Sequence, residues 1–203
     1  MAGLVTPVWA DRAGRLLPVL PVPHGAPAVL MVATPVTTLR DQARALVRAA
    51  LRAFLATLAG CPAEALNLHA EPGEAPRVDH LSPDGQPIHL SISHEAGLSL
   101  AAVCVGGRVG VDLMRAADAA MPDRQAIAQD YLGPVAAASL AALRGGDGQA
   151  AFARAWTRHE AALKCLGLRL QEWTPELERA LEQCRVSELA LPAGYVGAVA
   201  VCD

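Results

Sequence analysis

The sequence predicts an α+β fold that combines helices with small antiparallel sheets. Short apolar segments alternate with segments of helical periodicity, and several apolar segments come in pairs joined by turn residues, which is typical of hairpins. Of the 203 residues, 53% are hydrophobic and 18% are charged, which favours a well-packed globular protein over a disordered chain. A chain of this length has room for one large core or for two small fused cores.

The first sixty residues predict one buried strand and one long helix. Pro and Gly are frequent in residues 3–27, so only short strands fit there. Ala28–Thr34 is apolar and precedes a proline, which predicts a strand that ends there. Thr37 or Thr38 is expected to cap a helix, because apolar residues recur at helical spacing through residues 39–58 until a glycine ends the pattern.

The middle of the chain predicts short strands followed by a hairpin. Short strands are expected at residues 66–70 and 89–92, within regions rich in turn residues. Residues 98–105 and 109–113 are apolar, and Gly106–Gly107 separates them. The glycine pair predicts a tight turn, so the two segments are expected to pair with each other.

The last eighty residues predict helices and a closing hairpin. Three segments show helical periodicity, and the run Gly145–Gly148 before the third is expected to be a flexible linker. Residues 186–191 and 195–201 are expected to pair around a Pro-Ala-Gly turn. The three helical segments are residues 124–132, 135–143 and 149–166.

The charge and cysteine content exclude several functions. A formal net charge of −3 and a pI near 6.1 give no basic face for nucleic acid or for an anionic membrane. The apolar stretch 16–36 contains five prolines and His24, so neither a signal peptide nor a membrane span is expected. The cysteines are odd in number, scattered and without C-x-x-C spacing, which predicts reduced thiols in a cytoplasmic protein. They are Cys61, Cys104, Cys165, Cys184 and Cys202.

The tetrapeptide Ser91-Ile92-Ser93-His94 is the first candidate for a binding site. Its two hydroxyls and its imidazole can all donate hydrogen bonds to a phosphate. The same side chains can instead satisfy backbone groups at the end of a strand, and for an isolated tetrapeptide this second interpretation is favoured.

Two carboxylates on different predicted elements form the second candidate. Asp112 ends an apolar strand, where it can bind a hard cation or serve as a turn residue before the next helix. Glu160 and Lys164 lie one helical turn apart, which is usually a surface ion pair. Trp156 beside them indicates a helix that runs into a binding cleft, whereas His159 falls on the apolar stripe and is expected to be a core histidine.

Read in order, three segments resemble the signature of surfactin-synthetase-type 4′-phosphopantetheinyl transferases. They are Ser91–His94, Gly110–Leu113 and Trp156–Lys164, and the resemblance extends over about residues 44–201. It implies two pseudo-symmetric α+β halves, each a small antiparallel sheet packed with helices, with an active-site cleft between them.

The implied halves are residues 1–107 and 108–203. The implied activity is the Mg²⁺-dependent transfer of the 4′-phosphopantetheine moiety of coenzyme A to a serine of an apo acyl or peptidyl carrier protein. The fused architecture predicts a monomer.

The resemblance also implies roles for individual residues. Asp112 and Glu160 would hold Mg²⁺ on the pyrophosphate, and Glu160 would accept the proton of the attacking serine. Lys164 would neutralise the pyrophosphate, and Ser93 and His94 would contact the 3′-phosphate of coenzyme A. Further phosphate contacts are expected from Arg44, Arg48 and Arg77.

The sequence departs from the family pattern at three places. Met114 stands where the family has a second carboxylate, so water is expected to replace one metal ligand. His159 replaces a lysine, and the Gly-Lys-Pro motif survives only loosely, with Arg77 in place of its lysine. These departures leave a second hypothesis: a coenzyme A-binding homologue with impaired catalysis that regulates or scaffolds a synthase.

Overall fold

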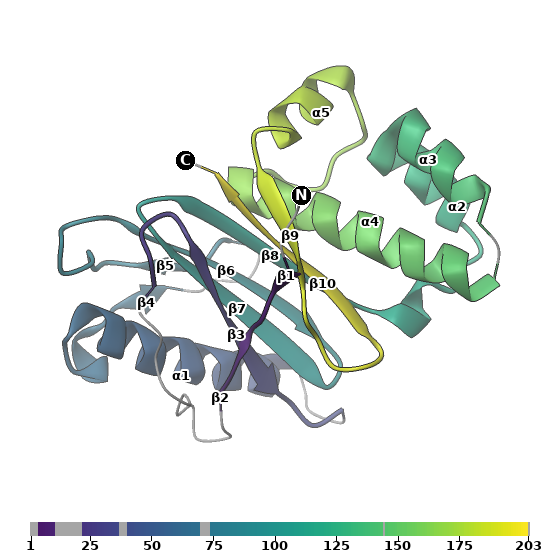
Figure 1. The fold of residues 1–203 in the computed structure, drawn as a ribbon. Helices are drawn as coiled ribbons and strands as arrows, with labels where there is room; N and C mark the ends of the chain where they lie inside the picture. The colour runs from purple at the N-terminus through teal and green to yellow at the C-terminus, as the bar shows by residue number, and fades with distance from the viewer. Residues whose placement is uncertain (1–3, 11–21, 37–39, 70–73, 144, 203) are drawn as a thin grey trace.

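Two four-stranded sheets form the centre of the protein, and each carries a helix on its outer face (Figure 1). The structure is a computed structural model that describes residues 4–10, 22–36, 40–69, 74–143 and 145–202. The predicted α+β class is confirmed. The capping residue predicted at position 37 or 38 lies outside the described residues.

The strands divide into an N sheet, a C sheet and a small two-stranded sheet. The N sheet has the order β2 (Val8–Ala10), β3 (Pro27–Ala33), β7 (Leu98–Val105), β6 (Ile88–Glu95). The C sheet has the order β1 (Leu4–Val5), β9 (Arg185–Leu189), β10 (Tyr195–Cys202), β8 (Arg108–Arg115). The third sheet pairs β4 (Leu68–His69) with β5 (Arg77–Val78).

Five α-helices and three irregular helical segments complete the described chain. The α-helices are α1 (Arg40–Ala59), α2 (Arg124–Ile127), α3 (Gly133–Ala141), α4 (Gly145–Leu166) and α5 (Pro175–Leu181). The 3₁₀ segments are η1 (Ala63–Ala65) and η2 (Ala116–Ala119), and η3 (Ala128–Leu132) is a π-helix. None of the described helices combines the length and the apolar character that a membrane crossing requires.

The two sheets pack face to face between α1 and α4. Side chains of a strand alternate between its two faces, so Leu100 of β7 meets the C sheet while Val103 meets α1. Val111 of β8 and Val199 of β10 fill the same inter-sheet core from the other side. Every residue of β7 is therefore buried.

The prediction that the segments on either side of Gly106–Gly107 pair with each other is wrong. The turn exists, but it passes from β7 in the N sheet to β8 in the C sheet. The observed hairpin is β6–β7, in which Glu95 lies opposite Leu98 and Gly97 adopts a φ of 91°. Both edges of β7 are already paired with β3 and β6, so no edge is left for β8.

Both sheets are mixed at one edge. The sequence predicts antiparallel sheets, but β1 pairs with β9 in parallel and β2 pairs with β3 in parallel. Strand β1 comes from the N-terminal segment and joins the C sheet. The division of the chain at residue 107 falls at the turn between β7 and β8 and stays a prediction.

Two helical boundaries differ from the sequence interpretation. Helix α4 begins at Gly145, so the predicted glycine linker forms its first turn. Helix α5 was not predicted, although its local signals are strong: the Thr174 side chain accepts a hydrogen bond from the Leu177 N–H, and Pro175 is the first helical residue.

Two serine hydroxyls join the sheets where the edge strands β6 and β8 meet. One edge of β8 pairs with β10. On the other edge, the N–H groups of Val111 and Leu113 donate to the hydroxyls of Ser91 and Ser93 over 3.0 and 3.2 Å. The two serine hydroxyls thus accept the hydrogen bonds that the backbone carbonyls of a neighbouring strand would otherwise accept.

Ser91→Ala is expected to lower the free energy of unfolding by about 1–3 kcal/mol, because it leaves the buried Val111 N–H without an acceptor. Chemical denaturation measures this change. The matched control is Ser139→Ala, whose hydroxyl bonds a backbone carbonyl on an exposed helix face and should change stability by less than about 0.5 kcal/mol. Equal effects of both substitutions would contradict a joining role for Ser91.

Candidate functional site

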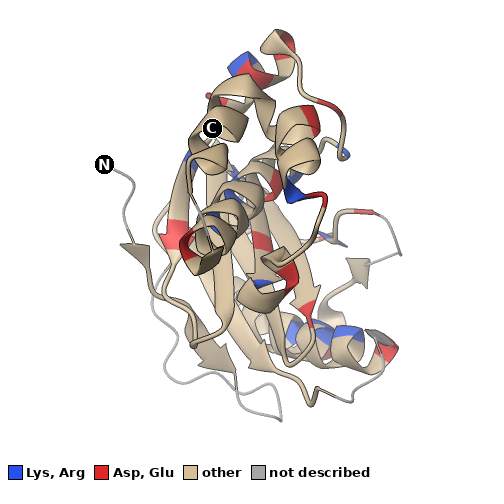
Figure 2. Ribbon diagram, turned by 90° about the vertical axis from the view of Figure 1, so that its right-hand side faces the viewer, with Lys and Arg blue, Asp and Glu red and all other residues tan. Residues whose placement is uncertain are grey.

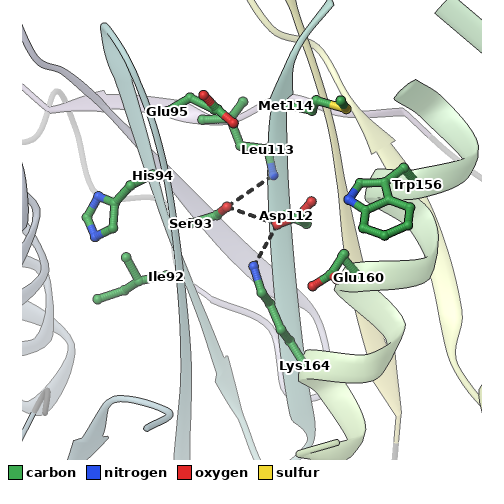
Figure 3. Close-up of a pocket in the computed structure, with 10 residues that line it drawn as sticks. All are labelled: Ile92, Ser93, His94, Glu95, Asp112, Leu113, Met114, Trp156, Glu160 and Lys164. Atoms are coloured by element: carbon green, nitrogen blue, oxygen red, sulfur yellow. Dashed lines mark hydrogen bonds and ion pairs between the residues drawn. The ribbon is translucent and has the colours of Figure 1, made fainter. Parts of the chain in front are cut away.

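A cavity of about 350 Å³ opens where β6, β8 and α4 meet (Figure 3). This volume is at the low end for ligand pockets, so the cavity fits the charged part of a large ligand rather than its whole length. Ten residues line it: Ile92, Ser93, His94, Glu95, Asp112, Leu113, Met114, Trp156, Glu160 and Lys164.

Asp112 lies at the centre of the cavity with one oxygen bonded and one exposed to it. Strand alternation turns Asp112 toward α4 while Val111 and Leu113 enter the inter-sheet core. Its Oδ1 accepts from the Ser93 hydroxyl at 3.0 Å and from Lys164 Nζ at 2.6 Å. Its Oδ2 receives no hydrogen bond from any described residue, so this oxygen can bind a cation.

Helix α4 reaches Asp112 because it lies unusually close to β8. Gly110 makes this possible, since a Cβ at this position would lie 2.0 Å from the carbonyl oxygen of Ala161. The close contact brings Glu160 and Lys164, which are one turn apart, beside Asp112 (Figure 3).

Three carboxylates share the cavity with one lysine. Burial raises the pKa of Glu160, and the nearby Asp112 raises it further, while Lys164 opposes the shift. Burial also raises the pKa of Glu95, and the charges of Asp118 and Asp112 add to this. The carboxylates therefore repel one another, and a bound cation would relieve this repulsion.

In metal-free protein, Glu160→Gln is expected to increase the free energy of unfolding near pH 7. The folded pKa of Glu160 lies above its value of 4.5 in the unfolded chain, so stability falls as pH rises from the unfolded pKa through the folded one. The Glu160→Gln substitution removes this carboxylate charge and therefore restores the stability that is lost at high pH. Denaturation in the presence of a chelator at about pH 7 and about pH 4 should show the larger gain at the higher pH. A variant less stable at both pH values would contradict this.

The same cavity lies largely within the part of the chain that matches a known family. Residues 108–197 match the model of the 4′-phosphopantetheinyl transferase superfamily. This segment is similar to the superfamily and covers less than half of the 203-residue chain. No curated protein matches the chain in sequence. Asp112, Glu160 and Lys164 fall inside the matched segment, whereas the β6 residues that line the cavity precede it.

The donor set in the matched segment fits a hard divalent cation. Asp112 Oδ2 and the Glu160 carboxylate accept no hydrogen bond from the described residues and meet at the cavity. Carboxylate oxygens are the ligands that Mg²⁺ prefers, and one or two of them suffice when phosphate oxygens and water complete the shell. Met114 also lines the cavity but offers only a thioether.

Glu95 is the lining residue that sequence reasoning missed. It follows the Ser-Ile-Ser-His motif at the end of β6 and brings a third carboxylate from outside the matched segment. The sequence contains a signal for it, because an acidic residue would repel a phosphate bound at the neighbouring motif, so its position there calls for another role. Its approach to Asp112 depends on the packing of β6 beside β8, which no local pattern reports.

Ser93 and His94 both line the cavity but point in different directions. The Ser93 hydroxyl donates its only hydrogen to Asp112, so its observed role is to hold that carboxylate. His94 lies on the other side of β6 in Figure 3, with Nδ1 2.8 Å from the Ser99 hydroxyl. A shared phosphate contact for the two residues stays a prediction.

The three arginines predicted from the sequence are not among the residues that line the cavity. Arg44 and Arg48 lie four residues apart on α1, whose basic positions are visible in Figure 2. Arg44 pairs with Asp41 at 3.3 Å, and the Arg48 Nε donates to the Arg44 carbonyl. Arg77 lies exposed on β5. Their phosphate contacts stay predictions.

His159 does not replace the charge of the lysine found in the family. Its side chain is half-buried, and burial lowers its pKa, so the ring is neutral near pH 7. Its Nε2 is buried without a hydrogen-bond partner among the described residues. It packs beside Trp156, with ring centroids 6.4 Å apart.

Proposed function

We propose that the protein transfers the 4′-phosphopantetheine moiety of coenzyme A to a serine of an apo acyl or peptidyl carrier protein in a Mg²⁺-dependent reaction. The observation that carries the proposal is that Asp112 Oδ2 and the Glu160 carboxylate, which accept no hydrogen bond from the described residues, face the cavity beside Lys164 (Figure 3). This arrangement suits a metal-bound pyrophosphate, and it lies in the segment that matches the superfamily model, which supports this type of transfer.

Asp112, Glu160 and Glu95 would hold Mg²⁺, which would neutralise charge that develops on the pyrophosphate. Ser93 and Lys164 orient Asp112 by bonding its Oδ1, which leaves Oδ2 directed at the cavity. Lys164 uses two of its three N–H bonds on Asp112 Oδ1 and the Val111 carbonyl, so the third can meet a phosphate oxygen.

Glu160 is the group that would accept the proton of the attacking serine. The serine oxygen forms a bond to the β-phosphorus, the bond from this phosphorus to the bridging oxygen breaks, and adenosine 3′,5′-bisphosphate leaves with the electron pair. In the metal-free protein, burial and the nearby Asp112 raise the pKa of Glu160, so this carboxylate takes up a proton more readily than an exposed glutamate does.

Glu95→Gln is expected to weaken Mg²⁺ binding by about tenfold or more, because Glu95 supplies the carboxylate that Met114 cannot. Isothermal titration calorimetry or Mn²⁺ electron paramagnetic resonance measures the affinity directly. The control is Glu64→Gln, an acidic residue of the exposed segment η1. Unchanged affinity in the Glu95 variant would mean that water completes the metal shell, as the sequence alone predicted.

Intact-mass analysis of an apo carrier protein tests the activity. The carrier is incubated with this protein, coenzyme A and Mg²⁺, and in parallel with a chelator in place of Mg²⁺. A Mg²⁺-dependent gain of one phosphopantetheine on the carrier serine supports the proposal. Binding of coenzyme A without any gain, across acyl and peptidyl carriers, would favour the impaired binding protein that Met114 suggests.

A further inference from the structure

Three of the five cysteines converge in space on the side of the C sheet that α4 covers. The sulfur atoms of Cys165, Cys184 and Cys202 all lie within 4.8 Å of one another. Two of them, Cys165 and Cys202, are 3.4 Å apart. The other two cysteines, Cys61 and Cys104, lie elsewhere and belong to the packing of other cores.

The three thiols come from three different elements. Cys165 lies near the end of α4, Cys202 ends β10, and Cys184 lies in the turn between α5 and β9. Gaps of nearly twenty residues separate them, so no local sequence motif brings them together. Tertiary packing does, where the C-terminal parts of α4 and β10 lie together (Figure 1).

We propose that these three thiols form a site for one thiophilic d¹⁰ cation, Zn²⁺ or Cu⁺. Thiolate ligands select these ions over Mg²⁺. With metal–sulfur bonds of about 2.3 Å, three sulfurs around one ion lie roughly 4 Å apart, close to the spacing already present. The site is separate from the cavity, since none of the three cysteines lines it.

The surroundings of the thiols suit a closed soft-metal site. Cys165 and Cys202 are buried among small apolar residues such as Ala161 and Ala200, whose side chains offer no oxygen ligand for a hard cation. Cys184 is only half-buried, so an ion can enter from its side. Three thiolates match the trigonal coordination of Cu⁺, and water at Cys184 can supply the fourth ligand of Zn²⁺.

Without metal, the thiols of Cys165 and Cys184 stay protonated near pH 7. Burial raises the pKa of Cys184 to about 11 and also raises that of Cys165, so neither is a reactive thiolate near pH 7. Binding the cation forms three metal–sulfur bonds and releases the thiol protons to solvent, without any change in oxidation state. No oxidant is needed.

A bound ion would cross-link the helix that carries Glu160 and Lys164 to the sheet that carries Asp112. Cys165 directly follows Lys164, and Cys202 is the last described residue of β10. Because the ion binds only the folded arrangement, it should raise the melting temperature of the protein.

The test is an anaerobic titration of the reduced full chain with Zn²⁺, with Cu⁺, and with Cd²⁺ as a spectroscopic probe. We expect one equivalent of Cd²⁺ to produce a sulfur-to-metal charge-transfer band, and Zn²⁺ or Cu⁺ to compete with Cd²⁺ for the site. Competition against a chromophoric chelator ranks the two physiological ions. Cys184→Ala, at the most exposed of the three positions, should weaken binding by about 100-fold or more and abolish the rise in melting temperature.

Cys61→Ala is the matched control, because Cys61 is half-buried like Cys184 but lies outside the cluster. It should leave binding unchanged. A charge-transfer band that is absent, or that survives Cys184→Ala, would overturn the site. So would a disulfide between Cys165 and Cys202 that forms in the metal-loaded protein on exposure to air, because ligated sulfurs are not free to pair.

Discussion

Asp112→Asn is expected to slow carrier-protein modification by about 1000-fold at saturating coenzyme A, which corresponds to roughly 4 kcal/mol of lost transition-state stabilisation. The amide can still accept hydrogen bonds from Ser93 and Lys164, so the fold around the cavity should persist. What disappears is the negative charge at the position of Oδ2, which the proposed cation requires.

Two further measurements separate a catalytic effect from a structural one. Mg²⁺ affinity should fall together with the rate, while the melting temperature should change little. Asp123→Asn is the control, because Asp123 is exposed and its side chain makes no capping hydrogen bond. A variant at position 112 that binds Mg²⁺ normally and modifies the carrier at the wild-type rate would contradict the proposed metal site.

Local patterns predicted the elements whose apolar residues recur at helical spacing or form an apolar run between turn residues. Helix α1 is the clearest case, because Val47, Leu51 and Leu55 repeat at helical spacing and all reach the core. The closing hairpin β9–β10 was found for a similar reason, since turn residues separate two apolar segments.

Strand pairing was predicted less well because it depends on distant residues. The turn at Gly106–Gly107 is correct, yet sequence adjacency cannot report that β3 and β6 already occupy both edges of β7. A run of apolar residues such as Leu98–Val105 predicts burial on both faces, and this burial was the signal that the strand lies inside a sheet rather than at its edge.

Five of the eight residues predicted for the site lie together in the structure. Ser93, His94, Asp112, Glu160 and Lys164 line one cavity, although they come from three elements. Two features of the cavity depend on tertiary contacts, so the sequence does not predict them. The first is Glu95, whose carboxylate joins the cavity from the end of β6, and the second is the engagement of the Ser93 hydroxyl by Asp112.

Gly110→Ala is expected to destabilise the protein by about 3 kcal/mol or more and to disrupt the site at the same time. The added Cβ would lie 2.0 Å from the Ala161 oxygen and 2.4 Å from the Cys165 nitrogen. Both are backbone atoms of α4, so no side-chain rotation relieves the clash. The helix must move away from β8, which separates Glu160 and Lys164 from Asp112, and a displacement of about 1 Å can cost 100-fold in rate.

Gly146→Ala on the same helix distinguishes this effect from the general consequences of replacing glycine. A Cβ at position 146 meets no atom within 4 Å, so alanine should stabilise α4 by about 0.5–1 kcal/mol through its higher helix propensity. Urea denaturation and Mg²⁺ titration of both variants measure stability and site geometry separately. If Gly110→Ala retained wild-type stability and Mg²⁺ affinity, the close approach of α4 to β8 could not be what places the two carboxylates together.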